Sequence, residues 1–197
     1  MAVRAAVALA AALALAGCDR ILAPAKSPFH AIDVTGAPMG RNLSLIDHNG
    51  IPRTLADFRG KVVLVNFGYT QCPDVCPTTL ADLASAVRKL GAEGERVQVL
   101  FVTVDPKRDT RELLGKYVPA FDPRFLGLRG DVEATAQVTK EFRVYAAERD
   151  GKTPESYTVE HSAQTFAFDP QGRLRLVIAY GAPPDDIAAD LRLLLNS

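Results

Sequence analysis

The fold is set by the run KVVLVNF at residues 61–67 and by the loop GYTQCPDVCP that follows it at 68–77. The run is apolar and β-branched almost throughout, which is typical of a strand buried on both faces of a sheet. A second run of this kind lies at 97–104. Between the two runs, apolar residues recur at the helical spacing, at Leu80, Leu83, Val87 and Leu90. This strand–helix–strand order predicts two neighbouring parallel strands with a helix packed across them.

The rest of the chain continues this alternation. Helices are predicted over 109–118, 131–142 and 187–195, and strands at 125–128, 164–168 and 174–179. An Asn-Gly turn at 49–50, between two short apolar runs, predicts a β-hairpin ahead of all of them. The whole order predicts an α/β fold with a mainly parallel central sheet covered by helices on both faces and an N-terminal β-hairpin.

The composition is that of an ordinary folded domain and excludes several classes of protein. The chain has 197 residues, of which 48% are hydrophobic and 23% charged, values that a disordered or fibrous chain does not show. The 23 Lys and Arg residues balance the 23 Asp and Glu residues, and no basic run occurs. A near-neutral chain of this kind gives no support for a nucleic-acid partner.

Residues 1–17 have the features of a secretory leader. A charged start is followed by an uninterrupted small and apolar run. As a helix this run reaches only ~20 Å, which is too short for the ~30 Å hydrocarbon core of a bilayer. The run ends in LAGC at residues 15–18, which resembles the bacterial lipobox, in which the cysteine is acylated and becomes the new N-terminus. We therefore expect Cys18 to be lipidated; the alternative is a plain leader cut near Ala16.

These features divide the chain into three parts. Residues 1–17 are the predicted leader, 18–40 the lipidated N-terminus with a flexible tether, and 41–197 the folded domain. Asp19 follows the predicted lipid attachment site, and in lipoproteins of some bacteria this residue type favours retention at the inner membrane. The expected location is the bacterial cell envelope, on the extracytoplasmic face of the cytoplasmic membrane, with a lipid anchor.

Two cysteines carry the thiol chemistry of the predicted domain. Cys72 and Cys76 follow a buried strand and open a helix, which is where α/β sheets place their sites. A helix N-terminus stabilises negative charge, so we expect both thiols to ionise more readily than a free cysteine. The pair could serve as a redox-active dithiol or as two metal ligands. It could also form a structural disulfide, although so small a loop gains little stability from a cross-link.

A metal site would need a further ligand, and the chain offers three histidines. His30 lies in the predicted tether, and His48 lies in a polar hairpin turn, where a solvated side chain is expected. His161 follows the long polar connection 148–160 and directly precedes an apolar strand. In a thioredoxin-like sheet, whose cysteine loop this one resembles, the residue that enters this strand lies close to that loop. We therefore predict His161 as the third ligand.

Cys72, Cys76 and His161 would form a soft set of two thiolates and one imidazole. Thiolates select copper(I), and imidazole suits copper in either oxidation state. A structural zinc site closes a tetrahedron with a fourth protein ligand, which would have to be an Asp or Glu here, so zinc is disfavoured rather than excluded. A site that stays open on one side suits a carrier, because a partner's ligand can attack before the metal dissociates.

The sequence resembles the Sco/SenC family of copper-binding, thioredoxin-like proteins. The resemblance rests on four segments in the family's order: FGYTQCPDVCP at 67–77, VDPKRDT at 104–110, FRVY at 142–145 and HS at 161–162. An Asp often precedes the family's histidine, whereas Glu160 stands here and keeps the charge.

The resemblance implies a thioredoxin-like fold, with Cys72, Cys76 and His161 as ligands of copper(I) or copper(II). It further implies delivery of copper to the binuclear copper site of cytochrome c oxidase, or maturation of that site. The implied partners are the oxidase subunit that carries the site and an upstream copper donor or thiol reductant. Such a chain would be a carrier rather than an enzyme with turnover.

Other functions stay open at this point. Cys72 and Cys76 could reduce the cysteines of the oxidase copper site or of other extracytoplasmic proteins, with Cys72 as the nucleophile and no required role for His161. A peroxidase is disfavoured because no Pro precedes Cys72 in its loop, and a redox or copper sensor is a further alternative. Asp105 could orient a ligand, stabilise the cysteine loop or only open a turn, while Asp109 and the Thr after it are most simply a helix cap.

Overall fold

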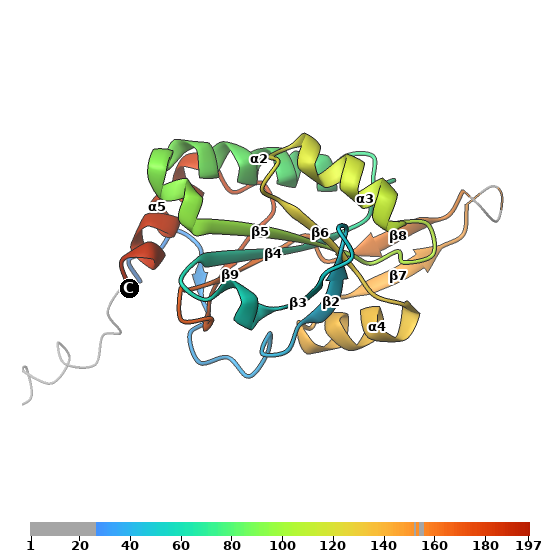
Figure 1. Ribbon diagram of the computed structural model, residues 1–197, viewed down its shortest axis with the longest axis horizontal. Helices are drawn as coiled ribbons and strands as arrows, with labels where there is room; N and C mark the ends of the chain where they lie inside the picture. The colour runs from blue at the N-terminus through green and yellow to red at the C-terminus, as the bar shows by residue number, and fades with distance from the viewer. Residues whose placement is uncertain (1–26, 152, 154–155) are drawn as a thin grey trace, which may run out of the picture.

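The computed structural model describes residues 27–197 apart from 152 and 154–155. Its centre is one eight-stranded sheet in the order β1-β10-β9-β4-β5-β6-β2-β3 (Figure 1). The strands of this sheet are β1 (Ile32–Asp33), β2 (Ser44–Asp47), β3 (Pro52–Thr54), β4 (Val62–Gly68), β5 (Val97–Thr103), β6 (Leu126–Arg129), β9 (Thr165–Phe168) and β10 (Leu174–Ile178). A separate two-stranded sheet consists of β7 (Ala146–Arg149) and β8 (Thr158–His161).

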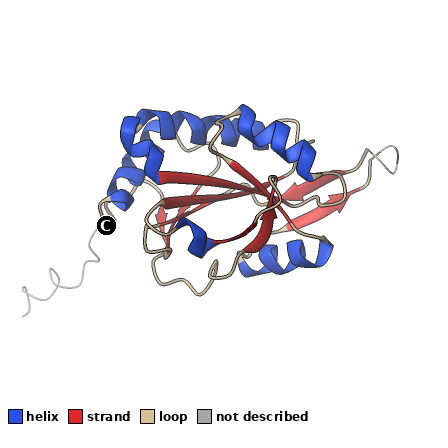
Figure 2. Cartoon of the chain, in the orientation of Figure 1, coloured by secondary structure: helices blue, strands red, loops and turns tan. Residues whose placement is uncertain are grey.

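Helices cover both faces of the main sheet, as the sequence predicted. The α-helices are α2 (Val75–Lys89), α3 (Arg111–Tyr117), α4 (Val132–Glu141) and α5 (Pro184–Leu195). Short 3-10 helices are η1 (Leu55–Phe58), η2 (Gly91–Arg96) and η3 (Val118–Ala120). In the view of Figure 2, α2 and α3 lie above the sheet and α4 lies below it, while α5 lies at the left end of the sheet and packs against α2.

β4 and β5 form the centre of the sheet and confirm the two buried strands that the sequence predicted. Every residue of both strands is buried. The strands pair in parallel, from Val62 opposite Val97 to Gly68 opposite Thr103. Their side chains point alternately into two hydrophobic cores, one beneath α2, α3 and α5 and one against α4 and η1. This double burial fixes the position of the β4 end that carries the cysteine loop.

The main sheet is mixed, whereas the sequence predicted a mainly parallel one. Only the pairs β4–β5 and β5–β6 are parallel among the described strands of this sheet, and the other five pairings are antiparallel. These include the pair of β2 and β3, which form a hairpin. The error lies mainly in β9, which runs antiparallel beside β4. An apolar strand buried on both faces has the same residue pattern in either direction, so periodicity does not report its polarity.

The region 148–160, which the sequence predicted as a polar connection, contains most of a β-hairpin. β7 and β8 pair from Ala146 opposite His161 to Arg149 opposite Thr158. Their residues are mostly exposed, so they lack the apolar alternation that signals a strand. The hairpin lies to the right of the main sheet in Figure 1 and ends at His161.

The folded part of the chain begins before residue 41, the start that the sequence predicted. β1 pairs with β10 at the edge of the sheet. Ahead of β1, the backbone N–H groups of His30 and Ala31 donate to the carboxylate of Asp190 in α5, each at 2.8 Å. Phe29 packs against the core beneath the same helix. The sequence did not reveal this segment because its contacts are made mainly by backbone groups.

The predicted leader and the predicted lipidation site Cys18 lie outside the described residues. Their assignments therefore stay predictions. In the part of the chain that the structure describes, no helix is both long and apolar enough to cross a membrane.

Candidate metal centre

The cysteine loop lies at the carboxyl end of β4, where α/β sheets place their sites. Cys76 is the second residue of α2, and Cys72 lies one turn earlier. The backbone N–H of Cys76 donates to the Sγ of Cys72 at 3.4 Å, and the N–H of Cys72 donates to the carbonyl of Tyr69 at 3.2 Å. These two bonds fold the loop back on itself and bring the sulfur atoms together.

Cys76 is packed against the backbone of β4. Its residue is 1% exposed, whereas Cys72 is half-buried. A Cβ atom at Gly68 would lie 2.7 Å from the Sγ of Cys76 and 2.7 Å from the ring of Phe101. Contacts this short do not occur in folded proteins, so the position of Cys76 requires a residue without a side chain at the end of β4.

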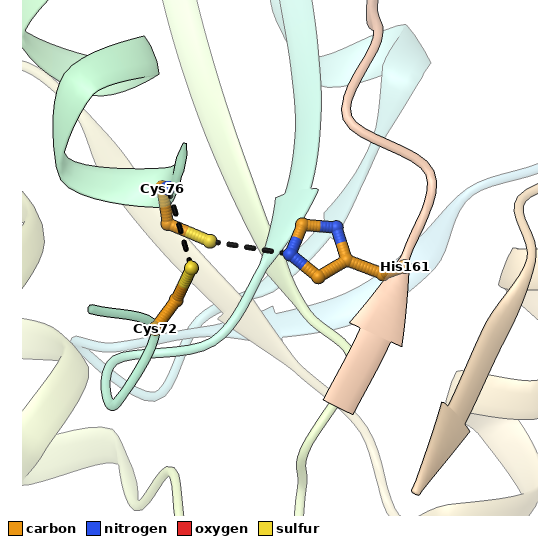
Figure 3. A group of neighbouring side chains, drawn as sticks. All are labelled: Cys72, Cys76 and His161. Atoms are coloured by element: carbon orange, nitrogen blue, oxygen red, sulfur yellow. Dashed lines mark hydrogen bonds between the residues drawn. The ribbon is translucent and has the colours of Figure 1, made fainter. Parts of the chain in front are cut away.

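His161 faces this pair from the end of β8. Its Nε2 lies 3.3 Å from the Sγ of Cys76 (Figure 3). Its Nδ1 lies 2.9 Å from the backbone carbonyl of Ser162. A carbonyl only accepts, so Nδ1 carries the hydrogen and donates it. In the neutral ring, Nε2 is then the nitrogen with a free lone pair, and it points at the cysteines. This is the tautomer that a metal ligand needs, fixed by the kind of bond that orients ligand histidines.

Burial shifts the pKa values of His161 and Cys76. It lowers the pKa of His161, against a smaller opposing effect of the bond to Ser162, so the imidazole is neutral at pH 7. Burial also raises the pKa of the Cys76 thiol well above its ordinary value. The expectation that the helix N-terminus makes both thiols ionise more readily is therefore wrong for Cys76. Loss of solvent around the buried sulfur outweighs the helix dipole there.

The structure brings all three predicted ligands together. The Sγ atoms of Cys72 and Cys76 and a ring nitrogen of His161 all lie within 4.8 Å of one another. Both cysteines are free thiols. Two sulfurs and one imidazole nitrogen at this spacing could hold one soft metal ion after the thiols lose their protons, or the sulfurs could form a disulfide with each other.

The other two histidines lie elsewhere. His30 is exposed and lies 3.7 Å from the carboxylate of Asp186. His48 was expected to be solvated, but it is half-buried, and its Nδ1 accepts a hydrogen bond from the backbone N–H of Gly127 at 3.0 Å. It has this structural role because the hairpin turn packs against β6, a contact that local sequence does not show.

Asp109 supports the cysteine loop in a way that sequence reasoning missed. Its buried carboxylate accepts hydrogen bonds from the hydroxyl of Thr70 at 2.6 Å, from the N–H of Thr70 at 3.1 Å and from the hydroxyl of Thr103 at 2.6 Å. The helix cap that the sequence assigned to Asp109 and Thr110 together is made by Thr110 alone, whose side chain accepts from the N–H of Leu113. The one available signal was its place in the VDPKRDT segment.

Comparison with known families adds an independent finding. A profile described as SCO1/SenC matches residues 33–196. The chain belongs to the SCO1/SenC family. The family resemblance seen in the sequence is thus confirmed over nearly the whole described region.

Relatives within the SCO1/SenC family include mitochondrial and bacterial proteins. The chain is 44% identical over 133 residues to the mitochondrial SCO2 homolog of Mus musculus, which covers 66% of this chain and 52% of the mouse protein. The match thus spans about half the length of the mammalian SCO2 relatives. The SCO2-like protein of Rickettsia felis is 33% identical over 155 residues, covering 78% of this chain and 76% of that protein.

Solved structures of SCO1/SenC proteins confirm the predicted thioredoxin-like fold class. Apo Sco1 from Thermus thermophilus has a TM-score of 0.76 and 40% identity, covering 87% of this chain and 99% of that chain. ScoI from Bradyrhizobium japonicum, solved with copper bound, has a TM-score of 0.73 and 37% identity, covering 80% and 99%.

Proposed function

We propose that this chain binds one copper ion through Cys72, Cys76 and His161 and delivers it to the binuclear copper site of cytochrome c oxidase. The observation that carries the proposal is the convergence of two sulfurs and one imidazole nitrogen within 4.8 Å. The family supports copper as the metal, since ScoI of Bradyrhizobium japonicum and Sco1 of yeast have been solved with copper bound. The family also supports cytochrome c oxidase as the destination of the copper, since the Sco family is described as one of cytochrome c oxidase assembly proteins.

The ligand set favours copper over zinc. Thiolate sulfur prefers copper(I), and a neutral imidazole binds either oxidation state of copper. Structural zinc would need a fourth protein ligand, and the cluster of candidate ligands found in the described residues contains no carboxylate beside these three groups.

The different burial of the ligands gives copper transfer a direction. Cys76 is buried against β4, while Cys72 and His161 are half-buried. A thiolate or imidazole of a partner protein therefore meets the copper ion from the side of Cys72 and His161. Stepwise exchange replaces these two ligands first and Cys76 last, so the metal never leaves protein ligands.

The N-terminal segment is proposed to tether the domain to the outer face of the cytoplasmic membrane through a lipid on Cys18. The support is the LAGC sequence at 15–18. Replacement of Cys18 by Ser is expected to release the protein from the membrane fraction of cells, and retention of the variant at the membrane would contradict the anchor.

Copper titration of the reduced, leader-free protein tests the proposed function. Competition with a copper(I) chelator is expected to give one copper per chain. Cys72→Ser, Cys76→Ser and His161→Ala are each expected to weaken binding at least about tenfold, which corresponds to ~1.4 kcal/mol. His30→Ala, at an exposed histidine outside the site, is the matched control and is expected to bind like the unchanged protein. Unaltered affinity in His161→Ala would contradict the three-ligand site.

Thiol–disulfide exchange is a second candidate, favoured by the hydrogen bond from the Cys76 N–H to the Sγ of Cys72. The Cys72 thiolate would attack one sulfur of a partner's disulfide, and the other partner sulfur would leave and take up a proton. Cys76 would then lose its proton and attack the Sγ of Cys72, which releases the second partner thiol. The pair loses two electrons, and the partner's disulfide gains them.

His161→Ala separates the two candidates. Under the copper proposal this variant loses copper affinity, while its dithiol stays oxidisable by oxidised glutathione. A reduced protein that binds no copper tightly but cycles readily with oxidised glutathione would transfer the assignment to thiol–disulfide exchange. The double cysteine variant is uninformative here because it removes both activities.

A further inference from the structure

Arg108 lies between the two segments that carry the proposed ligands. It follows β5, and its side chain is 14% exposed. Its Nη1 donates to the side-chain oxygen of Gln71, the neighbour of Cys72, at 3.2 Å. The same nitrogen donates to the backbone carbonyl of Tyr157 at 2.8 Å, directly before β8 begins. One guanidinium group thus links the cysteine loop to the strand that ends at His161.

Asp105 bonds both Arg108 and Tyr157. Its carboxylate is 1% exposed and accepts from the Nε of Arg108 and, at 2.8 Å, from the hydroxyl of Tyr157. The Cζ of Arg108 also lies 3.6 Å from the centroid of the Tyr157 ring. Tyr157 is therefore held at its backbone, its ring and its hydroxyl by one buried ion pair. Bonds in such a shielded network are stronger than the same bonds in water.

Tyr69 supplies a second path from Arg108 to the site. The Cζ of Arg108 lies 5.6 Å from the centroid of the Tyr69 ring. Tyr69 in turn packs edge-on against His161, with ring centroids 5.9 Å apart and an interplanar angle of 87°. The guanidinium thus contacts two residues that adjoin His161. Tyr157 directly precedes the strand that ends at His161, and Tyr69 packs against the imidazole ring.

We propose that Arg108 is a positioning residue that fixes the separation of His161 from Cys72 and Cys76, and so decides whether copper has three ligands or two. This inference rests on the proposed function. The need for such a device follows from the fold, because His161 belongs to a two-stranded sheet separate from the one that positions the cysteines. Asp105 and Tyr157 act as partners of Arg108 in the same role.

The test is a double-mutant cycle between Arg108→Lys and His161→Ala, with copper(I) affinity as the readout. Lysine keeps the charge but loses the planar group that bonds Asp105 through Nε while Nη1 bonds both Gln71 and Tyr157. Arg108→Lys alone is expected to weaken copper binding about 10–100-fold, the usual effect of removing a group that orients a ligand. In the His161→Ala background, the same change is expected to have no further effect, because the ligand that Arg108 positions is gone.

Two controls separate positioning from general loss of structure. Arg124→Lys is the matched variant, since Arg124 pairs in the same way with the buried carboxylate of Asp122 but at a different place; it is expected to leave copper affinity unchanged. Tyr157→Phe removes only the hydroxyl that bonds Asp105, and it is expected to weaken binding in the same direction with little loss of thermal stability. In the copper-free protein, the NMR signals of the His161 ring are expected to shift in Arg108→Lys while those of His48 stay in place.

Failure of the positioning role and failure of the proposed copper site give different results. An equal loss of affinity from Arg108→Lys with and without His161, or an unchanged affinity in both Arg108→Lys and Tyr157→Phe, would overturn the positioning role while leaving the copper site intact. Absence of copper binding by the unchanged protein, or full affinity in His161→Ala, would overturn the proposed function itself and the inference with it.

Discussion

Cys76 and Phe101 occupy the space that a side chain at Gly68 would need. An added methyl group would lie 2.7 Å from each of them, and both neighbours are buried and cannot move aside. Gly68→Ala is therefore expected to destabilise the protein by about 1–3 kcal/mol, the usual cost of overpacking a core. It is also expected to displace the Cys76 sulfur and weaken copper binding. Urea unfolding and copper titration of the variant measure the two effects.

Gly115 offers a matched control in α3. A methyl group there would lie 3.6 Å or more from His48, an ordinary contact. Gly115→Ala is expected to leave stability unchanged or to raise it by up to about 1 kcal/mol, because alanine favours a helix over glycine. Equal losses in the two variants would show that the close approach at Gly68 is not the cause.

His48 couples the stability of the fold to pH. Its Nδ1 accepts from the N–H of Gly127, which a protonated imidazole cannot do. Burial lowers the pKa of His48 below its ordinary value, against a smaller opposing effect of Asp47. The unfolded chain therefore binds a proton more readily than the folded one. Stability is expected to be complete above about pH 6.5 and to fall as the pH drops through the lowered pKa of the folded state.

His48→Asn tests this coupling because its side-chain oxygen can replace Nδ1 as the acceptor without titrating. The variant is expected to lose less stability between pH 7.5 and pH 5 than the unchanged protein, as measured by urea unfolding. The same substitution at the exposed His30 is the control. Burial lowers the pKa of His161 as well, so part of the pH dependence is expected to persist in His48→Asn. An identical pH dependence in the variant would rule out the role of His48.

Among the secondary-structure elements, the loop between β5 and α3 fixes the position of the cysteine loop. Asp109 in this loop bonds Thr70 of the cysteine loop and Thr103 of β5. Asp109→Ala leaves these buried donors without an acceptor. The free energy of unfolding is expected to fall by about 1–3 kcal/mol, the usual cost of an unpaired buried polar group. The substitution is also expected to weaken copper binding by freeing the cysteine loop. Thermal unfolding and copper titration measure both.

Asp109→Asn is the conservative companion. Its carbonyl still accepts one bond, and the threonine hydroxyls can rotate to accept from its amide. We expect it to retain most of the stability that Asp109→Ala loses. If the two variants were equally damaged, the negative charge rather than the hydrogen bonds would be what holds the loop.

The elements differ in how far the sequence could predict them. The strands β4 and β5 and the helix α2 carry long apolar patterns, and their positions were predicted closely. The hairpin β7–β8 was missed because it is mostly exposed and its pairing is made by backbone bonds, which any residue can form. The supports of the site were hidden for a different reason. Asp105 was one candidate for a role at the site and Asp109 was assigned to a helix cap, because only the folded chain brings their buried carboxylates to Tyr157 and Thr70.

Across the whole molecule, the grouping of the three candidate ligands was predictable because the chain offers so few cysteines and histidines. Cys76 and His161 lie 85 residues apart, yet with two cysteines in the predicted domain and three histidines in the chain the choice was short. The residue pattern of β9 does not report its polarity, which the choice of His161 took from a thioredoxin-like sheet alone. This polarity decides how His161 reaches the cysteines. Because β9 runs antiparallel to β4, its first residue lies beside the end of β4. The segment from His161 into β9 therefore arrives at the same edge of the sheet as the cysteine loop.

The start of the domain is also a property of the whole molecule, because residues 29–33 contact parts of the chain that lie far away in sequence. Asp190 is 1% exposed, and its carboxylate accepts from the N–H groups of His30 and Ala31. A chain that starts at residue 41 loses both charge-assisted bonds and the pairing of β1 with β10. We expect such a chain to unfold with a free energy lower by on the order of 3 kcal/mol than a chain that starts at residue 27.

Asp190→Asn distinguishes this specific contact from a general effect of shortening. In the longer chain, the asparagine amide would face one of the two N–H donors, so the substitution is expected to cost about 1–3 kcal/mol. In the shorter chain, the donors are gone and water reaches the side chain, so the same substitution is expected to change little. Urea unfolding of the four proteins gives the coupling energy directly. Equal effects in both chains would mean that the two bonds to Asp190 do not contribute, and that the N-terminal segment stabilises the domain through its other contacts, such as the pairing of β1 with β10.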